Sequence, residues 1–220
     1  MRKQTLFITS IVLLAIILYS FKTPLIDGAN KNLNTNLDEK IERKVDSVLA
    51  LMRLNEKIGQ LVQYSGKWNA TGPSASNADK HKLNKLKNGE VGSMLNITSV
   101  ASIRETQKMV MDHSRLKIPL IFGYDVIHGY KTIFPIPLGE SASWDLEIIK
   151  KTAAIAAKET AASGIQWTFA PMIDISRDAR WGRVMEGAGE DVYLNTVIGV
   201  ARVQGFQGDD LSLPTTIAAC

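Results

Sequence analysis

The residue in this sequence best placed for binding or catalysis is Asp125, which follows a short apolar run. Residues 118–122 (IPLIF) predict a buried strand, and Gly123, Asp125 and His128 come directly after it. In sheets whose strands alternate with helices, polar groups at the carboxyl end of a strand face the ligand crevice. A carboxylate there can accept hydrogen bonds from two adjacent hydroxyls, the geometry that a sugar ring offers. The alternative is that Asp125 caps the turn after the strand, but its position at the strand end favours a binding site.

A second set of charges lies in the segment DISRDARWGRVMEGAGED, residues 174–191, which includes Arg177, Arg180 and Arg183. A loop of this kind is either a structural web of salt bridges or a clamp on a ligand, and composition does not separate the two. Trp181 offers an aromatic surface on which the apolar face of a sugar could stack, or it packs against the protein.

His128 could carry a proton or bind a ligand, because the reference pKa of histidine is about 6.5. The other two histidines, His81 and His113, do not lie at metal-ligand spacing, so we expect no metal site and assign His128 to hydrogen bonding in the wall of the site. The sequence has no GxSxG, GxxxxGK[ST] or Cys/His pair. It therefore lacks the signatures of the usual serine hydrolases, P-loop proteins and thiol enzymes, and we expect no cofactor.

The composition indicates a globular protein whose partner is not a nucleic acid. With 220 residues, 45% of them hydrophobic, the chain can bury a sizeable core. Its 26 Lys and Arg residues are scattered among 22 Asp and Glu residues rather than clustered with aromatics. The single cysteine, Cys220, excludes a disulfide framework and a CxxC metal site, and it is predicted to be a small core residue on a strand.

The first residues resemble a secretory signal. Arg2 and Lys3 precede an uncharged apolar stretch of 14 residues, 6–19, which is shorter than the roughly 20 residues of a membrane-spanning helix. We expect residues 1–20 to be a signal peptide or signal anchor and the protein to be exported to the periplasm or the cell exterior. No other stable membrane insertion is expected.

Helices and strands are predicted to alternate after a linker at residues 21–36. Helical spacing or capping residues mark residues 37–52, 55–62, 99–116, 145–164 and 191–206. Short apolar runs mark strands at residues 91–97, 118–124, 166–175 and 215–220. This alternation predicts an α/β fold with a parallel sheet, and a TIM-like (β/α)8 barrel is favoured over an open doubly wound sheet because no GxGxxG follows the first strand. In the last helix, the residues expected to face inward are Val192, Leu194, Val197 and Val200.

The last apolar run, residues 215–220, reaches the end of the sequence. A core strand without a partner leaves sheet hydrogen bonds unmet, so we expect residues 37–220 to be the N-terminal portion of a barrel that is truncated at its C-terminus.

Four segments carry a resemblance to a known family: EKIGQLVQ (56–63), GEVGSMLN (89–96), IFGYDVIHGYKTIFPIPLG (121–139) and WTFAPMIDISRDARWGRVMEGAGEDVYL (167–194). Together they resemble the N-terminal barrel domain of glycoside hydrolase family 3, most closely the periplasmic β-glucosidase type. The resemblance implies a retaining, exo-acting β-glycosidase that releases terminal β-linked glucose, with a β-xylosidase of the same family as the near alternative. A non-catalytic sugar-binding barrel is the alternative from another functional class.

By position, Asp125 and Arg183 match the family's aspartate and arginine that hold hydroxyls of the sugar in the innermost subsite. Retaining enzymes of this kind use a carboxylate nucleophile and a carboxylic acid about 5 to 5.5 Å apart. The resemblance places both beyond Cys220, so no residue of this chain is assigned either role. Glu186 and Glu190 are expected to shape the loop as partners of the arginines.

Overall fold

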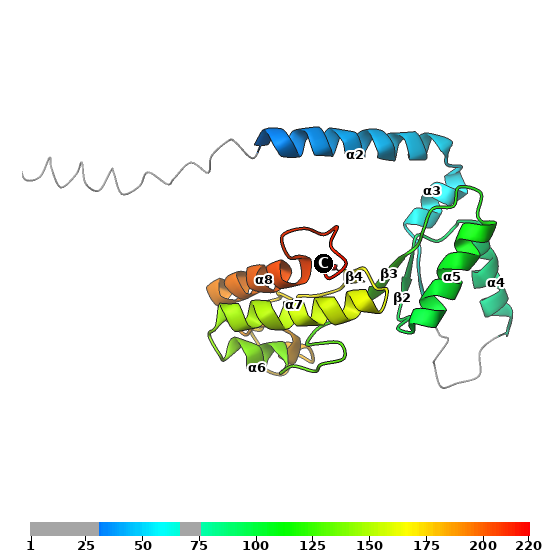
Figure 1. Cartoon of the computed structure of the whole chain (residues 1–220). Helices are drawn as coiled ribbons and strands as arrows, with labels where there is room; N and C mark the ends of the chain where they lie inside the picture. Colours follow the sequence, from blue (N-terminus) through cyan, green and yellow to red (C-terminus); the bar gives the residue numbers. More distant parts are fainter. Residues whose placement is uncertain (1–30, 67–75) are drawn as a thin grey trace, which may run out of the picture. The chain divides into compact units, whose positions relative to one another are not determined.

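The computed structural model describes residues 31–66 and 76–220, and these residues divide into two units at position 51, one before it and one after it (Figure 1). The predicted signal at residues 1–20 and the first part of the predicted linker, residues 21–30, lie outside the described residues. Helix α2 (Lys31–Leu51) begins earlier than expected, so residues 31–36 are helical. The helix thus takes in the last six residues of the predicted linker, and the linker itself stays a prediction.

Helix α2 is amphipathic, as its spacing of apolar residues predicts. Its apolar stripe is exposed and consists of Ile41, Val45, Val48 and Leu49. Within residues 31–66 and 76–220, no helix is long and apolar enough to cross a membrane.

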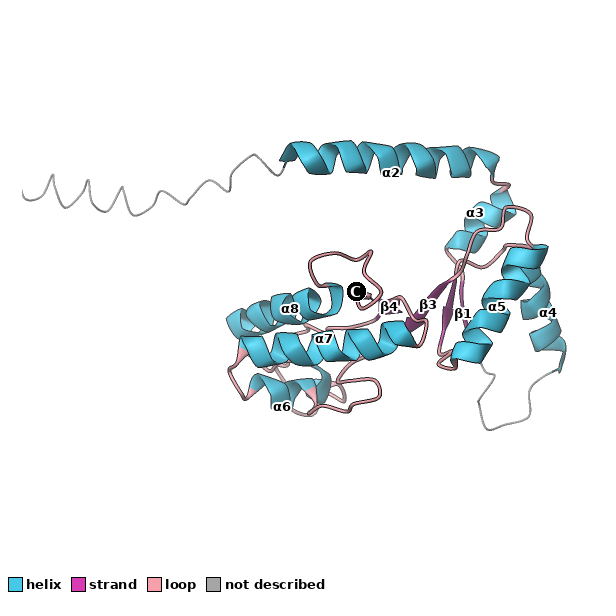
Figure 2. Cartoon of the chain, viewed as in Figure 1, coloured by secondary structure: helices cyan, strands magenta, loops and turns pink. Residues whose placement is uncertain are grey.

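The second unit is built on a parallel sheet whose strands lie side by side in sequence order, β1-β2-β3-β4-β5. The strands are β1 (Gln63–Ser65), β2 (Ser93–Leu95), β3 (Ile121–Tyr124), β4 (Trp167–Thr168) and β5 (Ala218–Ala219). The helices are α3 (Leu54–Gln60), α4 (Ser76–Lys87), α5 (Val100–His113), α6 (Pro137–Ser141), α7 (Leu146–Ala162) and α8 (Val192–Gln207), with a 3-10 turn η2 (Val184–Glu186) (Figure 2). Helices connect each strand to the next, which confirms the predicted α/β class and is the arrangement of a TIM-like barrel.

The strands are shorter than the sequence predicts, and four elements, β1, α4, α6 and η2, were not predicted. Strand β4 has two residues, whereas the pattern indicated ten, because only Trp167 and Thr168 pair with both neighbouring strands. Strand β1 is too short to show an alternating pattern. Helix α4 (SNADKHKLNKLK) carries only two leucines among polar residues, so its helical periodicity is weak.

Helices α7 and α8 begin at side-chain caps, which fix where each of these connections turns back onto the sheet. The carboxylate of Asp145 accepts a hydrogen bond from Ile148 N at 3.0 Å, as predicted for the start of α7. Asp191 accepts from Leu194 N at 2.6 Å at the start of α8. Gly164, with φ +89°, follows the end of α7 in a conformation that favours glycine.

Two hydrophobic clusters pack the helices onto one face of the sheet. The first surrounds Phe122 and includes Ile103 and Val110 of α5. The second joins alanines of α7 to Phe206 of α8. Helices α7 and α8 run side by side (Figure 1) and approach so closely that a Cβ at Gly205 would lie 2.3 Å from Lys150 O.

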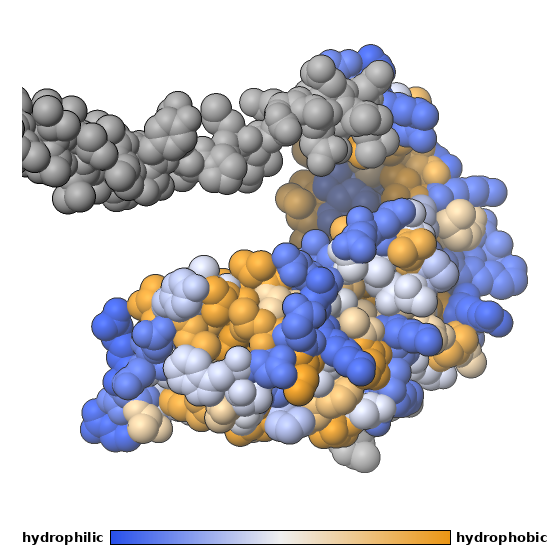
Figure 3. All heavy atoms as spheres, turned by 60° about the vertical axis from the view of Figure 1, so that its left-hand side comes forward, coloured by the Kyte–Doolittle hydropathy of each residue, from blue (hydrophilic) through white to orange (hydrophobic). Residues whose placement is uncertain are grey.

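The inward face of α8 agrees only in part with the prediction. Leu194 is half-buried and packs against the cluster of Ile149, Ala188, Ile198 and Ala201, and Val197 is half-buried. Val192 and Val200 are 59% and 53% exposed, and the buried positions are instead Asn195, Ile198, Gly199, Ala201, Arg202, Gly205 and Phe206. Small residues face α7 because the two helices are in close contact, which turns the valines outward. Figure 3 shows hydrophobic surface (orange) between hydrophilic patches on this part of the molecule. Cys220 is also exposed, not buried as expected.

Candidate functional site

Asp125 is the first residue past the carboxyl end of β3, as predicted. Its side chain is exposed and makes no hydrogen bond or ion pair with residues 31–66 or 76–220. The next residue, Val126, is completely buried, and its N–H donates to Thr168 Oγ1 of β4 at 3.1 Å. A capping carboxylate would accept the following backbone N–H groups, so the structure gives no support to the capping alternative. The carboxylate of Asp125 is available to a ligand.

The segment that carries Asp125, residues 125–134 and called the β3 loop below, is held by hydrogen bonds to several other parts of the chain. Arg202 of α8 donates from Nη2 to Ile127 O, and Tyr130 Oη donates to Thr98 O at 3.2 Å. On the outer side, the Glu159 carboxylate of α7 accepts from Lys131 N (2.8 Å), Thr132 N (2.8 Å) and Thr132 Oγ1 (2.6 Å). These hydrogen bonds lower the pKa of Glu159, and the bond to the Thr132 side chain has the largest effect.

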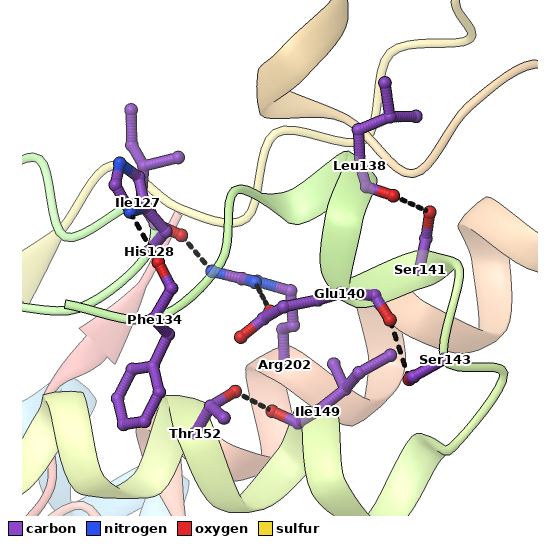
Figure 4. Close-up of polar contacts among 10 residues, drawn as sticks. All are labelled: Ile127, His128, Phe134, Leu138, Glu140, Ser141, Ser143, Ile149, Thr152 and Arg202. Carbon is purple, nitrogen blue, oxygen red and sulfur yellow. Dashed lines mark hydrogen bonds and ion pairs between the residues drawn. The ribbon is translucent and has the colours of Figure 1, made fainter.

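His128 has the hydrogen-bonding role that the sequence predicts. Its Nδ1 lies 3.0 Å from Phe134 O, within the β3 loop (Figure 4). A carbonyl oxygen only accepts, so Nδ1 carries the hydrogen in this bond. Among the described residues, no group of three His, Cys, Asp or Glu side chains is placed to hold a metal ion.

Arg183 lies in the segment after β4, residues 169–191 and called the β4 loop below, at the start of η2. Its guanidinium group pairs with Glu186 through Nε to Oε1 at 3.1 Å and Nη2 to Oε2 at 2.6 Å. The hydrogen bond from Arg183 lowers the pKa of Glu186. Glu186 raises the pKa of Arg183 most, and the charges of Asp174 and Asp125 add to the increase. The charge of Asp125 thus reaches Arg183, the other residue that the family resemblance assigns to the site.

The charges of the β4 loop form separate local pairs, and Glu190, expected to partner an arginine, is exposed and makes no ion pair with residues 31–66 or 76–220. Asp178 accepts from Arg180 Nη2 at 2.6 Å, and both side chains are exposed. Buried Asn195 of α8 holds the end of the loop by accepting from Ala188 N at 3.2 Å and donating to Gly189 O at 3.0 Å. Trp181 is 37% exposed, so part of its ring is open to solvent.

Two aromatic residues lie in and next to β4. In β4 and the two residues after it, Thr168 and Ala170 are completely buried, whereas the alternate residues Trp167 and Phe169 are half-buried. The two rings are 4.4 Å apart between centroids and tilted by 50°. Phe169 also covers Gly123, where a Cβ would lie 3.0 Å from the ring. A carboxylate, a guanidinium group and an apolar ring surface are the kinds of group that can bind a sugar.

The side chains that hold the β3 loop were not predicted from the sequence. Thr168 and Glu159 gave no signal, because each contacts residues 27 to 42 positions away. A signal did exist for Arg202, which is a charged residue within the apolar stretch VIGVARVQGF of α8. A charged residue in a packed helix face is expected to have a specific partner.

Comparison with known proteins places these features in a family. The model of the glycosyl hydrolase family 3 N-terminal domain matches residues 53–217. The chain is 43% identical over 164 residues to a periplasmic β-glucosidase of Salmonella typhimurium, an alignment that covers 74% of this chain and 20% of that protein. It is 29% identical over 197 residues to a β-xylosidase of Formosa agariphila, covering 89% of this chain and 22% of that protein.

Among solved structures, the β-glucosidase of Listeria innocua in complex with glucose aligns with a TM-score of 0.70 and 39% identity. A variant of the same enzyme in complex with laminaribiose aligns equally well. These alignments cover 81% of this chain and 26% of the Listeria chain. The chain thus spans about a quarter or less of the length of these relatives. With three quarters of its residues matched by the family model, the chain belongs to glycosyl hydrolase family 3 and corresponds to its N-terminal domain.

Proposed function

We propose that the protein acts as an exo-acting, retaining β-glucosidase that hydrolyses terminal, non-reducing β-D-glucosyl residues. In this proposal Asp125 and Arg183 bind hydroxyl groups of the terminal sugar. No residue of this chain is given the role of nucleophile or acid/base, so the active protein includes polypeptide beyond Cys220.

The observation that carries the proposal is the state of Asp125. Its carboxylate is exposed and unpaired within the described residues, while the backbone on its C-terminal side is buried and hydrogen-bonded to β4. An ordered main chain that presents a free carboxylate costs little reorganisation when a ligand binds. Arg183 supplies a positive charge nearby, although part of its hydrogen-bonding capacity is used by Glu186.

The chemistry of glycoside hydrolysis gives these contacts a catalytic value. The sugar ring flattens toward an oxocarbenium ion in the transition state. Hydrogen bonds from its hydroxyls to a carboxylate that strengthen during this change lower the barrier, whereas equally strong bonds in the ground state would not. Asp125 would therefore contribute to the rate by holding the sugar, without taking part in bond making.

Glucose is favoured as the terminal sugar because the Salmonella and Listeria relatives, at 43% and 39% identity, are named β-glucosidases. The β-xylosidase relative from Formosa, at 29% identity over most of the chain, supports xylose as the second candidate. The two sugars differ at one exocyclic hydroxymethyl group, which a barrel mouth can accept or reject.

The test is a substrate panel on the protein expressed from its complete reading frame. We expect the highest kcat/KM on 4-nitrophenyl β-D-glucoside, lower values on the β-xyloside, and β-glucose as the first product by proton NMR. Preference for the xyloside would establish the second candidate. Hydrolysis of no β-glycoside in the panel would reject an enzymatic role and leave a sugar-binding barrel.

Export is part of the proposal. It is supported by the basic and apolar pattern of residues 1–20 and by the periplasmic location in the name of the Salmonella relative. Cell fractionation of the source organism, followed by N-terminal sequencing of the mature protein, tests export and cleavage of the signal. Recovery of the intact chain in the cytoplasm would contradict it.

A further inference from the structure

A buried ion pair joins α6 to α8 behind the β3 loop (Figure 4). Arg202 Nη1 donates to Glu140 Oε2 at 2.5 Å, and each side chain is only 5% exposed. The guanidinium group also lies above the ring of Phe206, with its central carbon 5.7 Å from the ring centroid. Removing two charges from water is costly, so a buried pair of this kind needs a reason beyond the attraction between its members.

The pair is not optimised for stability. Glu140 Oε1 and Arg202 Nε are both buried without a hydrogen-bond partner among the described residues. Well-packed apolar residues of similar volume often stabilise a protein as much as a buried ion pair, or more. Stability alone therefore does not explain why Glu140 and Arg202 occupy these positions.

The second terminal nitrogen of Arg202, Nη2, indicates what the ion pair between Glu140 and Arg202 does. Its Nη2 donates to Ile127 O, which belongs to the β3 loop two residues after Asp125. Figure 4 shows Arg202 between Glu140 and the backbone of Ile127, with His128 beside it. Because Val126 N is fixed to Thr168 Oγ1 and Ile127 O is fixed to Arg202, the main chain directly after Asp125 is held at two consecutive residues.

We propose that Arg202, oriented by Glu140, is a positioning residue that sets the main chain at Ile127 and thereby aims the Asp125 carboxylate at the sugar. This inference rests on the proposed function, because it assigns Arg202 a role in the same binding site. Arg202 does not contact the substrate in this account. It acts through Ile127 and Asp125.

The decisive variant is the double substitution Glu140→Leu and Arg202→Met in the complete reading frame. It replaces both charges with apolar side chains of similar length and removes the bond to Ile127 O, so it preserves packing while releasing the loop. Arg115→Met is the matched control. It breaks the ion pair from Arg115 to Glu56, which has a similar length of 2.6 Å and whose members lie outside the β3 loop and its partners.

We expect the double variant to keep the urea midpoint of the wild type and to lose about 10- to 100-fold in kcat/KM on 4-nitrophenyl β-D-glucoside, because small displacements of a binding group are costly. In an Asp125→Ala background the same double substitution should change kcat/KM by less than about twofold, since residues that act through one another are not additive. Arg115→Met should lower the urea midpoint and leave kcat/KM unchanged. Unchanged kcat/KM in the double variant, or an equal loss in both backgrounds, would overturn the inference.

Hydrogen exchange supplies a readout that does not depend on hydrolysis. Exchange of the amides in residues 126–134 should be faster in the double variant than in the wild type, and unchanged in Arg115→Met. If the wild type hydrolyses no glycoside, the proposed function fails, while exchange in this loop still decides whether Arg202 positions it: unchanged rates reject the role. If the double variant does not fold, Arg202→Lys carries the same expectations, because a single ammonium group cannot reproduce the planar fork that joins Glu140 to Ile127.

Discussion

The β3 loop and the β4 loop each carry one predicted sugar-binding residue, but they are held in opposite ways. The contacts that fix the β3 loop come mainly from residues far away in the sequence, such as Thr168, Glu159 and Arg202, at separations of 27 to 75 residues. The charged contacts of the β4 loop are local: Asp178 with Arg180, two residues apart, and Arg183 with Glu186, three residues apart.

Asp125 and Arg183 are therefore positioned for a ligand in different ways. Asp125 is left unpaired on a main chain that distant elements fix, so the rest of the domain determines where its carboxylate points. Arg183 is paired with a neighbouring carboxylate on an exposed segment, so its position depends on its own loop. Substitutions around the β3 loop should therefore act at long range, whereas those in the β4 loop should have local effects.

The largest effect is expected for Asp125→Ala in the complete reading frame. Loss of two hydrogen bonds to a charged group should lower transition-state stabilisation by about 3 to 6 kcal/mol, about two to four orders of magnitude in kcat/KM. Urea unfolding should be unchanged, because the side chain is exposed and has no partner to lose in the described part of the chain. A loss of stability without a loss of activity would instead identify Asp125 as a structural residue.

Two glycines test whether the β3 loop is the more constrained segment. Gly129 has φ +116°, and a Cβ there would lie 2.0 Å from Thr132 O, whereas a Cβ at Gly182 in the β4 loop would meet no atom within 4 Å. Gly129→Ala should lower the free energy of unfolding by about 3 kcal/mol, and Gly182→Ala by less than about 0.5 kcal/mol. Equal costs, measured by urea unfolding, would remove the contrast between the loops.

Arg183→Met should reduce kcat/KM about 10- to 100-fold, because it removes one charged hydrogen-bond donor to the sugar. Glu186→Gln keeps an oxygen acceptor for Arg183 and should change kcat/KM by less than about threefold. Both values come from initial rates on the β-glucoside. A larger effect of Glu186→Gln than of Arg183→Met would show that Glu186, not Arg183, meets the substrate.

The smallest effect is expected for Glu159→Gln, which weakens the outer attachment of the β3 loop. It should cost about 1 kcal/mol of unfolding free energy near pH 7, because a neutral amide oxygen accepts the two backbone N–H groups less strongly and the amide nitrogen cannot accept from Thr132 Oγ1. The pKa of Glu159 is lowered from 4.5 in the folded state, so its stabilisation is fully present above pH 4.5 and is lost as the pH falls below that value. The difference between wild type and variant should therefore shrink in urea titrations from pH 6 to pH 3. A difference that grows on acidification would contradict this sign.

The contrast between the loops also explains what the sequence could and could not predict. Asp125 was found because a strand followed by an acid is a local pattern, and the pairing of Arg183 with Glu186 follows from a spacing of three residues. The anchors of the β3 loop depend on which elements become neighbours in the sheet. The contact from Thr168 to Val126, for example, exists only because β4 lies beside β3.

The inward face of α8 was misassigned in part for a related reason. Periodicity selects the most apolar stripe, which contains Val192 and Val200, but close packing on α7 selects small residues and the partner of Glu140. The buried face of α8 contains the charged residue Arg202, so it does not appear as an apolar stripe in the sequence. A rule based on hydrophobic spacing cannot anticipate a buried ion pair whose partner lies 62 residues away.

The central claim is that the Asp125 carboxylate binds hydroxyls of the terminal sugar, and a cycle of enzyme and substrate changes tests it most directly. Wild type and Asp125→Ala, both from the complete reading frame, are compared on an aryl β-D-glucoside and on its mono-deoxy analogues. The account predicts at least one hydroxyl whose removal costs the wild type 10-fold or more in kcat/KM but costs Asp125→Ala less than about twofold. Equal losses in both enzymes for every hydroxyl would contradict it.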